Sequence, residues 1–139
     1  MDLETQRRLN RINRDFYRRT AAEFDATRQR AWSGWRRMLD AVDLPLASVM
    51  DIGCGNGRLA RFLAEQQAHA FAYIGIDSNT ELLAYARSQD PRVKLELLKR
   101  DVILGTLPAR QAQLVALFGL LHHVPGAARR RQLLQSAAT

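Results

Sequence analysis

The fold can be worked out from residues 49–59, which read Val49-Met50-Asp51-Ile52-Gly53-Cys54-Gly55-Asn56-Gly57-Arg58-Leu59. A short apolar run ends in an acid, three glycines follow at every second position, and a helical pattern begins at Arg58. This order predicts a strand, a tight loop and a helix. Glycines suit unusual backbone dihedrals and the close approach of a ligand, and a helix N-terminus favours polar or anionic groups. The stretch therefore predicts a ligand-binding loop at the end of a strand.

The spacing of these glycines argues against two common nucleotide-binding loops. A dinucleotide-binding loop has a glycine three residues after its second one, and that position is Arg58 here. A loop for a nucleoside triphosphate ends in Gly-Lys-Ser/Thr, and this loop does not. This stretch alone also permits a second interpretation, a tight turn in an unrelated α/β domain.

The rest of the chain supplies helices first and then alternating strands and helices. Helices are expected at 3–26 and 31–42, where apolar residues recur at three- and four-residue steps. From residue 48 onward, strands are expected at 48–52, 70–76, 93–98 and 114–118, and helices at 57–68, 80–88 and 127–138. Strands separated by helices pair in parallel through right-handed crossovers. The sequence thus predicts an α/β fold with a Rossmann-like open parallel sheet.

Composition indicates a globular chain of one domain. The 139 residues are 47% hydrophobic and 25% charged, and no apolar run is long enough to cross a bilayer. The first ten residues lack the apolar core of a secretory signal, so we expect a cytoplasmic protein without membrane contact. Cys54 is the only cysteine, and the histidines form no ligand pattern with nearby acids. We therefore expect neither disulfides nor a bound metal.

The net charge of +7 has two interpretations. Nineteen of the 21 basic residues are arginine, which is consistent with a bias in base composition. It is also consistent with an electrostatic surface for nucleic acid. A dense group, which we expect on the outer face of the first helix, consists of Arg7, Arg8, Arg11, Arg14, Arg18 and Arg19.

Three acids each lie at the end of a predicted strand. Asp51 ends the first, Asp77 ends the second twenty residues after Gly57, and Asp101 follows the third. An acid at the position of Asp77 can accept hydrogen bonds from both ribose hydroxyls of a nucleoside that the glycine loop holds. A helix N-cap at Asp77 and a surface position for Asp101 are the alternatives.

Together these segments resemble the class I S-adenosylmethionine-dependent methyltransferases from about residue 46 to the end. The shared features are Asp-x-Gly-x-Gly-x-Gly after a strand, the acids Asp77 and Asp101, and the Leu-His-His segment at 121–123. The resemblance implies S-adenosyl-L-methionine as cofactor, with Asp101 at the adenine amino group and Val102 on the ring. The implied cofactor-binding residues are Tyr17, Arg28, Asp51, Gly53, Cys54, Gly55, Gly57, Asp77, Ser78, Asp101, Val102, Gly119 and Leu120. His122 and His123 are expected as a base or as groups that orient or shape the substrate pocket.

The N-terminal part carries a narrower resemblance. Residues 16–32 contain an aromatic pair, a Phe-x-x-Thr-Arg core and a later tryptophan, and they look like the entry segment of Trm9-like tRNA wobble-uridine methyltransferases. This resemblance implies that residues 1–45 form a helical lid over residues 46–139, with Tyr17 and Arg28 facing the cofactor's methionine carboxylate. Arginine suits that task because its fork matches a carboxylate. The alternatives are a solvated Arg28 and a Trp32 in the core.

A full domain of this family has seven strands, and only four can be placed here. We therefore expect a sheet truncated after the fourth strand, without strands 5–7, whose open edge a partner chain could cover. Three functions stay open: a methyltransferase for tRNA or a small molecule, a non-catalytic cofactor-binding module completed by another chain, and a basic RNA-binding accessory protein.

Overall fold

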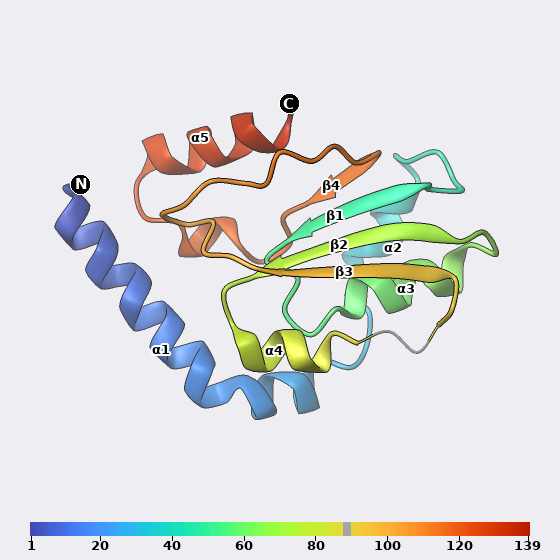
Figure 1. Cartoon of the computed structure of the whole chain (residues 1–139), viewed down its shortest axis with the longest axis horizontal. Helices are drawn as coiled ribbons and strands as arrows, with labels where there is room; N and C mark the ends of the chain where they lie inside the picture. Colours follow the sequence, from blue (N-terminus) through green and yellow to red (C-terminus); the bar gives the residue numbers. More distant parts are fainter. Residues whose placement is uncertain (88–89) are drawn as a thin grey trace.

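The computed structural model describes residues 1–87 and 90–139. Within these ranges one parallel sheet has the strand order β3-β2-β1-β4 (Figure 1). The strands are β1 (Ser48–Ile52), β2 (Phe71–Asp77), β3 (Val93–Lys99) and β4 (Leu114–Ala116). The chain runs outward from β1 to β3 and then crosses back to place β4 on the other side of β1, as in a doubly wound sheet. The predicted Rossmann-like parallel sheet is confirmed.

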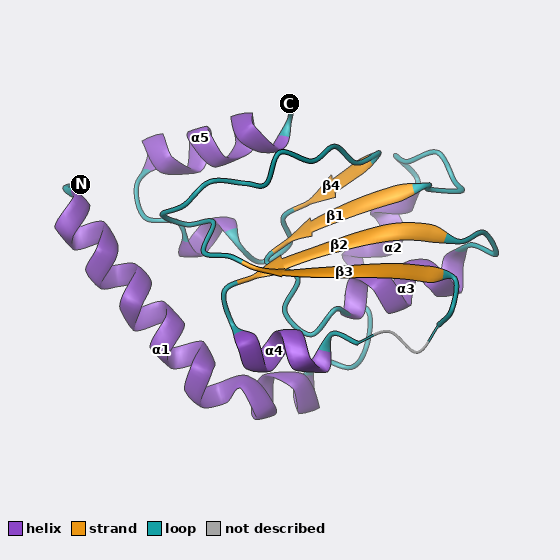
Figure 2. Ribbon diagram, viewed as in Figure 1, coloured by secondary structure: helices purple, strands orange, loops and turns teal. Residues whose placement is uncertain are grey.

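Helices cover both faces of the sheet (Figure 2). They are α1 (Leu3–Thr27), α2 (Gly34–Leu39), α3 (Arg58–Gln66), α4 (Thr80–Tyr85) and α5 (Ala127–Ala137), with a short 3-10 helix η1 (Leu121–His123). One core joins Trp35 of α2 and Phe62 of α3 to one face of the strands. A second core joins Leu133 of α5 and Val102 to the other face. The helix α1 lies at the end of the sheet toward which the strand arrowheads point (Figure 1).

Most element bounds agree with the sequence prediction to within two residues, but α2 and α4 are shorter by more than that, and β4 ends two residues early. The strand β4 ends at Ala116, not at residue 118, because its partner β1 turns away: the amides of Gly53 and Cys54 donate to the carbonyl of Ile76. The helix expected at 31–42 is regular only over Gly34–Leu39, after which i→i−3 bonds from Ala41 and Val42 replace the helical pattern. The helix predicted at 80–88 is too long, because α4 ends at Tyr85 with Ala86 as its C-cap; the last residue of that prediction, Ser88, lies outside the described residues.

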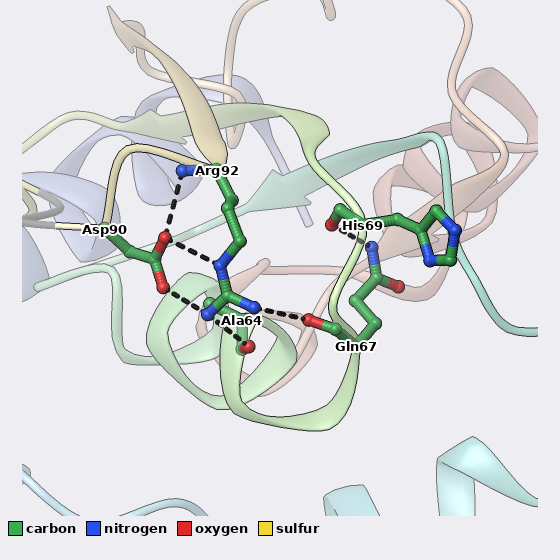
Figure 3. Close-up of polar contacts among 5 residues, drawn as sticks. All are labelled: Ala64, Gln67, His69, Asp90 and Arg92. Carbon is green, nitrogen blue, oxygen red and sulfur yellow. Dashed lines mark hydrogen bonds and ion pairs between the residues drawn. The ribbon is translucent and has the colours of Figure 1, made fainter.

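A polar network closes the amino-terminal edge of the sheet (Figure 3). Arg92 binds Asp90 and donates at 2.9 Å to the carbonyls of Ala64 and Gln67, where α3 ends. The buried amide of Gln67 donates to the carbonyl of Leu46 at 2.9 Å and accepts from its N–H at 2.8 Å. These bonds satisfy backbone groups that the helix end and the strand start leave unpaired. The polar side chains at this edge are thus bonded to one another and to the backbone, and they stabilise the fold there.

Three apolar residues that recur at helical steps in α1 are exposed, and the side of the helix that meets the protein carries a polar residue. Leu9, Ile12 and Phe16 are 44–58% exposed, whereas Asn10 and Ala21 are buried. Helical periodicity identifies residues that share a face, but not which face meets the rest of the chain. Here the polar face meets the acids at the carboxyl-terminal edge of the sheet.

Candidate functional site

A cavity of about 970 Å³ lies at the carboxyl-terminal edge of the sheet. Its walls come from the loops that follow the four strands and from α1. Open parallel sheets bind ligands at this edge, where the strand order reverses. Every site residue named from the sequence except Gly57 lines this cavity.

The glycine loop adopts backbone conformations that L side chains avoid. Gly53, Gly55 and Gly57 all have positive φ, at 81°, 53° and 71°. A Cβ on Gly57 would lie 3.0 Å from the carbonyl oxygen of Ala86, so this glycine serves the close packing of α3 against the end of α4. Gly53 and Gly55 line the cavity, and a Cβ on them would lie 3.3 Å from the side chain of Leu120 and 3.4 Å from that of Phe24.

The buried Asp51 is anchored within the sheet. Its carboxylate is 4% exposed and accepts a 2.5 Å hydrogen bond from the hydroxyl of Tyr73 on β2. Burial raises the pKa of Asp51 to about 7, although the Tyr73 bond opposes that change. Asp51 thus lies at the floor of the cavity with a carboxyl group that is readily protonated.

The carboxylate of Asp77 closes the glycine loop. It accepts the N–H of Gly55 at 3.0 Å and the N–H of Asn79 at 2.8 Å. Burial raises the pKa of Asp77, and the bonds from Asn79, Gly55 and Ser78 act against that rise. The N-cap of α4 is Asn79, whose side chain accepts from Glu81 and Leu82, so capping is not the role of Asp77.

Asp101 connects β3 to the distant helix α1. Its Oδ2 accepts from Asn10 Nδ2 at 2.7 Å and from Arg14 at 3.3 Å, and its Oδ1 accepts the N–H of Ile103 at 3.0 Å. The sequence reasoning did not identify Asn10, because 91 residues separate it from its partner. The helix α1 contains two asparagines, Asn10 and Asn13, and no sequence pattern separates the buried one from the other.

Tyr17 and His123 meet inside the cavity. The Tyr17 hydroxyl and His123 Nε2 are 3.0 Å apart, and the two rings pack edge to face. Burial, followed by the neighbouring His122, lowers the pKa of His123, and burial raises the pKa of Tyr17. The imidazole tautomer sets the direction of this bond: with the ring proton on Nδ1 the Tyr17 hydroxyl donates to Nε2, and with the proton on Nε2 the hydroxyl accepts.

The resemblance paired Tyr17 with Arg28, and both residues do line the cavity. In the structure the exposed Arg28 stacks its guanidinium 4.3 Å above the ring of Phe24. Trp32 is 53% exposed and packs against Phe118, while Trp35 is the tryptophan that enters the core. The alternative of a solvated Arg28 therefore fits this structure, whereas a core Trp32 does not.

Four arginines of α1 contribute to the cavity wall. Arg7, Arg11, Arg14 and Arg18 follow helical spacing and line the cavity, so the expectation that this group occupies only the outer face is wrong for them. Lys99 and Arg100 add positive charge at the end of β3. The acids at the strand ends are thus faced by a basic wall.

Asn56 ties the glycine loop to the end of α1. Its amide is 1% exposed and donates to Asp25 at 3.0 Å and to the carbonyl of Arg28 at 3.1 Å. The sequence reasoning assigned no role to Asn56 or Asp25.

Among the described residues, no group of three or more His, Cys, Asp or Glu side chains could hold a metal ion. The helices within those ranges are also too short or too polar to cross a membrane.

Comparison with known proteins agrees with this arrangement. A family model described as a methyltransferase domain matches residues 49–139. ECU09_1500 of Encephalitozoon cuniculi, named as a methyltransferase, is 32% identical over 120 residues, which are 86% of this chain and 52% of that protein.

Solved structures show the same fold. An S-adenosylmethionine-dependent methyltransferase from Mesorhizobium loti is 25% identical, with a TM-score of 0.56 over 77% of this chain and 48% of its own. The S-adenosylmethionine-bound amino pentose methyltransferase CalS10 of Micromonospora echinaspora is 22% identical, with a TM-score of 0.58 over 84% of this chain and 50% of its own. The chain thus spans about half the length of each of these proteins. It belongs to the class I S-adenosylmethionine-dependent methyltransferase family.

Proposed function

We propose that this chain binds S-adenosylmethionine in the cavity and transfers its methyl group to a negatively charged acceptor, RNA or a small molecule. The observation that carries the proposal is the convergence of the glycine loop, Asp77 and Asp101 on one cavity at the carboxyl-terminal edge of the sheet. The same loops hold the residues that the family resemblance assigns to the cofactor. Binding of S-adenosylmethionine by calorimetry, followed by a methyl-transfer assay, tests both parts.

The residues present fit this cofactor. Gly53 and Gly55 line the cavity without a side chain of their own, and the carboxylate of Asp77, which accepts the N–H groups of Gly55 and Asn79, lines it as well. Asn10 Oδ1 and Asn79 Nδ2 are buried without a partner in the described part of the chain, and both residues line the cavity. When bound, the cofactor supplies a methyl group already activated on a sulfonium. The protein then contributes orientation and the exclusion of water.

Within this proposal, His123 and not His122 is the base. His123 is half-buried, is neutral because its pKa is lowered, and already touches the hydroxyl of Tyr17, whereas His122 is exposed. With its ring proton on Nδ1, the neutral imidazole can accept a proton at Nε2 from the Tyr17 hydroxyl, which in turn takes the proton of the methyl acceptor. His123→Gln should lower kcat about 100-fold with little change in cofactor affinity, and His122→Gln serves as the control. Equal losses in the two variants would contradict the assignment.

The basic wall supports an anionic acceptor. Arg14 and Arg18 pair with Asp101 and Asp15, whereas Arg7 and Arg11 have no acidic partner among the described residues. Free guanidinium groups beside a cofactor cavity suit phosphates or carboxylates. This arrangement is consistent with the tRNA substrate that the N-terminal resemblance suggests.

Filter binding at two salt concentrations tests the RNA substrate. Affinity for tRNA should fall with a log–log slope of about −0.7 to −0.9 per neutralised phosphate. The double change Arg7→Gln and Arg11→Gln should flatten the slope, while changing the exposed Arg36 and Arg37 of α2 serves as the control. Equal affinity for tRNA and an unstructured RNA of equal length would favour a small-molecule acceptor.

A second candidate is a non-catalytic cofactor-binding module completed by another chain. It is favoured by β4, which has three residues and pairs only with β1 among the described strands. An unpaired edge is a template for another strand. Cofactor binding without methyl transfer, with activity restored by a second chain, would support this candidate.

A further inference from the structure

In the side-chain amide of Asn10 on α1, Nδ2 makes a hydrogen bond, whereas Oδ1 has no partner among the described residues. The side chain is 3% exposed and donates through Nδ2 to Asp101 Oδ2 at 2.7 Å. Since a carboxylate only accepts, this bond fixes which end of the amide faces Asp101. The other end, Oδ1, is buried and finds no donor in the described part of the chain, although Asn10 lines the cavity.

A buried acceptor without a donor is costly, and it indicates what a ligand must bring. Asp101 beside it is also an acceptor, and the protein groups bonded to it are donors: Asn10, Arg14 and the backbone N–H of Ile103. This part of the cavity therefore presents oxygen acceptors to its contents. An amino group, whose two N–H bonds can each meet one acceptor, fits these oxygens.

We propose that Asn10 is part of the cofactor site and that its Oδ1 accepts a hydrogen bond from the exocyclic amino group of the adenosyl moiety. This inference rests on the proposed function and adds to it a residue from α1. The same side chain then contacts both Asp101 and the ligand, so the bound cofactor stabilises α1 in its observed position.

The experiment compares two ligands that differ at this amino group. S-adenosylhomocysteine carries the amino group, and S-inosylhomocysteine carries a carbonyl oxygen in its place, which would face Oδ1 as a second acceptor. Calorimetry measures both affinities for the 139-residue chain and for Asn10→Ala. Asn13→Ala is the matched control, because Asn13 lies one turn away on α1 and lines the same cavity. Asn10→Leu keeps most of the side-chain volume and guards against a loss of packing.

We expect Asn10→Ala and Asn10→Leu to lower the affinity for S-adenosylhomocysteine about 10-fold. The affinity for S-inosylhomocysteine should fall less than about twofold, because that ligand has no amino group to donate to Oδ1. Asn13→Ala should leave the ratio of the two affinities unchanged. S-adenosylhomocysteine should also slow trypsin cleavage at the arginines of α1 in the parent chain and not in the Asn10 variants. That second readout reports on α1 independently of the affinities.

The other outcomes overturn the inference. Equal weakening of both ligands by the Asn10 variants would show that Asn10 only maintains structure. Unchanged affinity for both would show that Oδ1 does not contact the ligand. If the parent chain binds neither ligand, the proposed function fails as well, so the two failures are distinguishable.

Discussion

Replacement of Asp77 should test the cofactor site most directly. In the structure its two oxygens accept the backbone N–H groups of Gly55 and Asn79, and a carboxylate has about four lone-pair sites, so it can still accept from ribose hydroxyls. Hydrogen bonds to a charged group contribute about 1.5–3 kcal/mol each. Two such bonds at the lower end give about 3 kcal/mol, so Asp77→Ala should weaken binding by at least about 100-fold. Asp77→Asn keeps one good acceptor and should lose about 10-fold.

The assay is calorimetry with S-adenosylhomocysteine at several pH values. Hydroxyl donors favour the ionised carboxylate, and burial raises the pKa of free Asp77. Affinity of the parent chain should therefore increase as pH rises through that pKa, and Asp77→Asn should not show this dependence. Asp40→Ala, at the exposed end of α2, is the control. Affinities of both Asp77 variants within threefold of the parent, with folding intact, would refute the assignment.

Three further predictions concern stability and α1. Gln67→Ala leaves the N–H and carbonyl of buried Leu46 unpaired. It should lower the free energy of unfolding, measured by urea titration, by roughly 2–5 kcal/mol. Gln66→Ala, at an exposed position, is the control. Folding raises the pKa of Asp51 from 3.8 to about 7, so the folded state binds more protons than the unfolded state. The free energy of unfolding should therefore fall by roughly 3–4 kcal/mol as pH rises from about 4 to 7. Asp51→Asn should remove this contribution, and a variant with the same pH profile as the parent would contradict the prediction. Deleting residues 1–30 should weaken cofactor binding in a chain that remains folded, and an unchanged dissociation constant would contradict a lid.

The sequence was sufficient for the sheet because its signals are local. Alternation of strands and helices, with the glycine loop after the first strand, predicts parallel order. The acids at the strand ends then meet because carboxyl ends of parallel strands share one edge. Asp51, Asp77 and Asp101 follow from this rule, and the structure places all three on one cavity.

The arrangement of α1 could not be read from the same signals. Leu9, Ile12 and Phe16 recur at helical steps, yet they are exposed and the structure buries Asn10. The contacts that decide this, Asn10 with Asp101 and Asn56 with Asp25, join residues 91 and 31 positions apart. Single polar side chains of this kind leave no periodic trace in a sequence.

The helix α1 is attached to the glycine loop near its C-terminal end, so a rotation about that point moves its N-terminal end furthest. Asn56 holds the C-terminal end of α1 at Asp25, and Asn10 lies fifteen residues nearer the N-terminus. At 1.5 Å per residue the two points are about 22 Å apart along the helix axis. A tilt of only about 5° at the loop would therefore carry Asn10 through about 2 Å, enough to break its 2.7 Å bond to Asp101. A rotation of α1 about its attachment to the glycine loop would thus act most strongly on the Asn10–Asp101 contact.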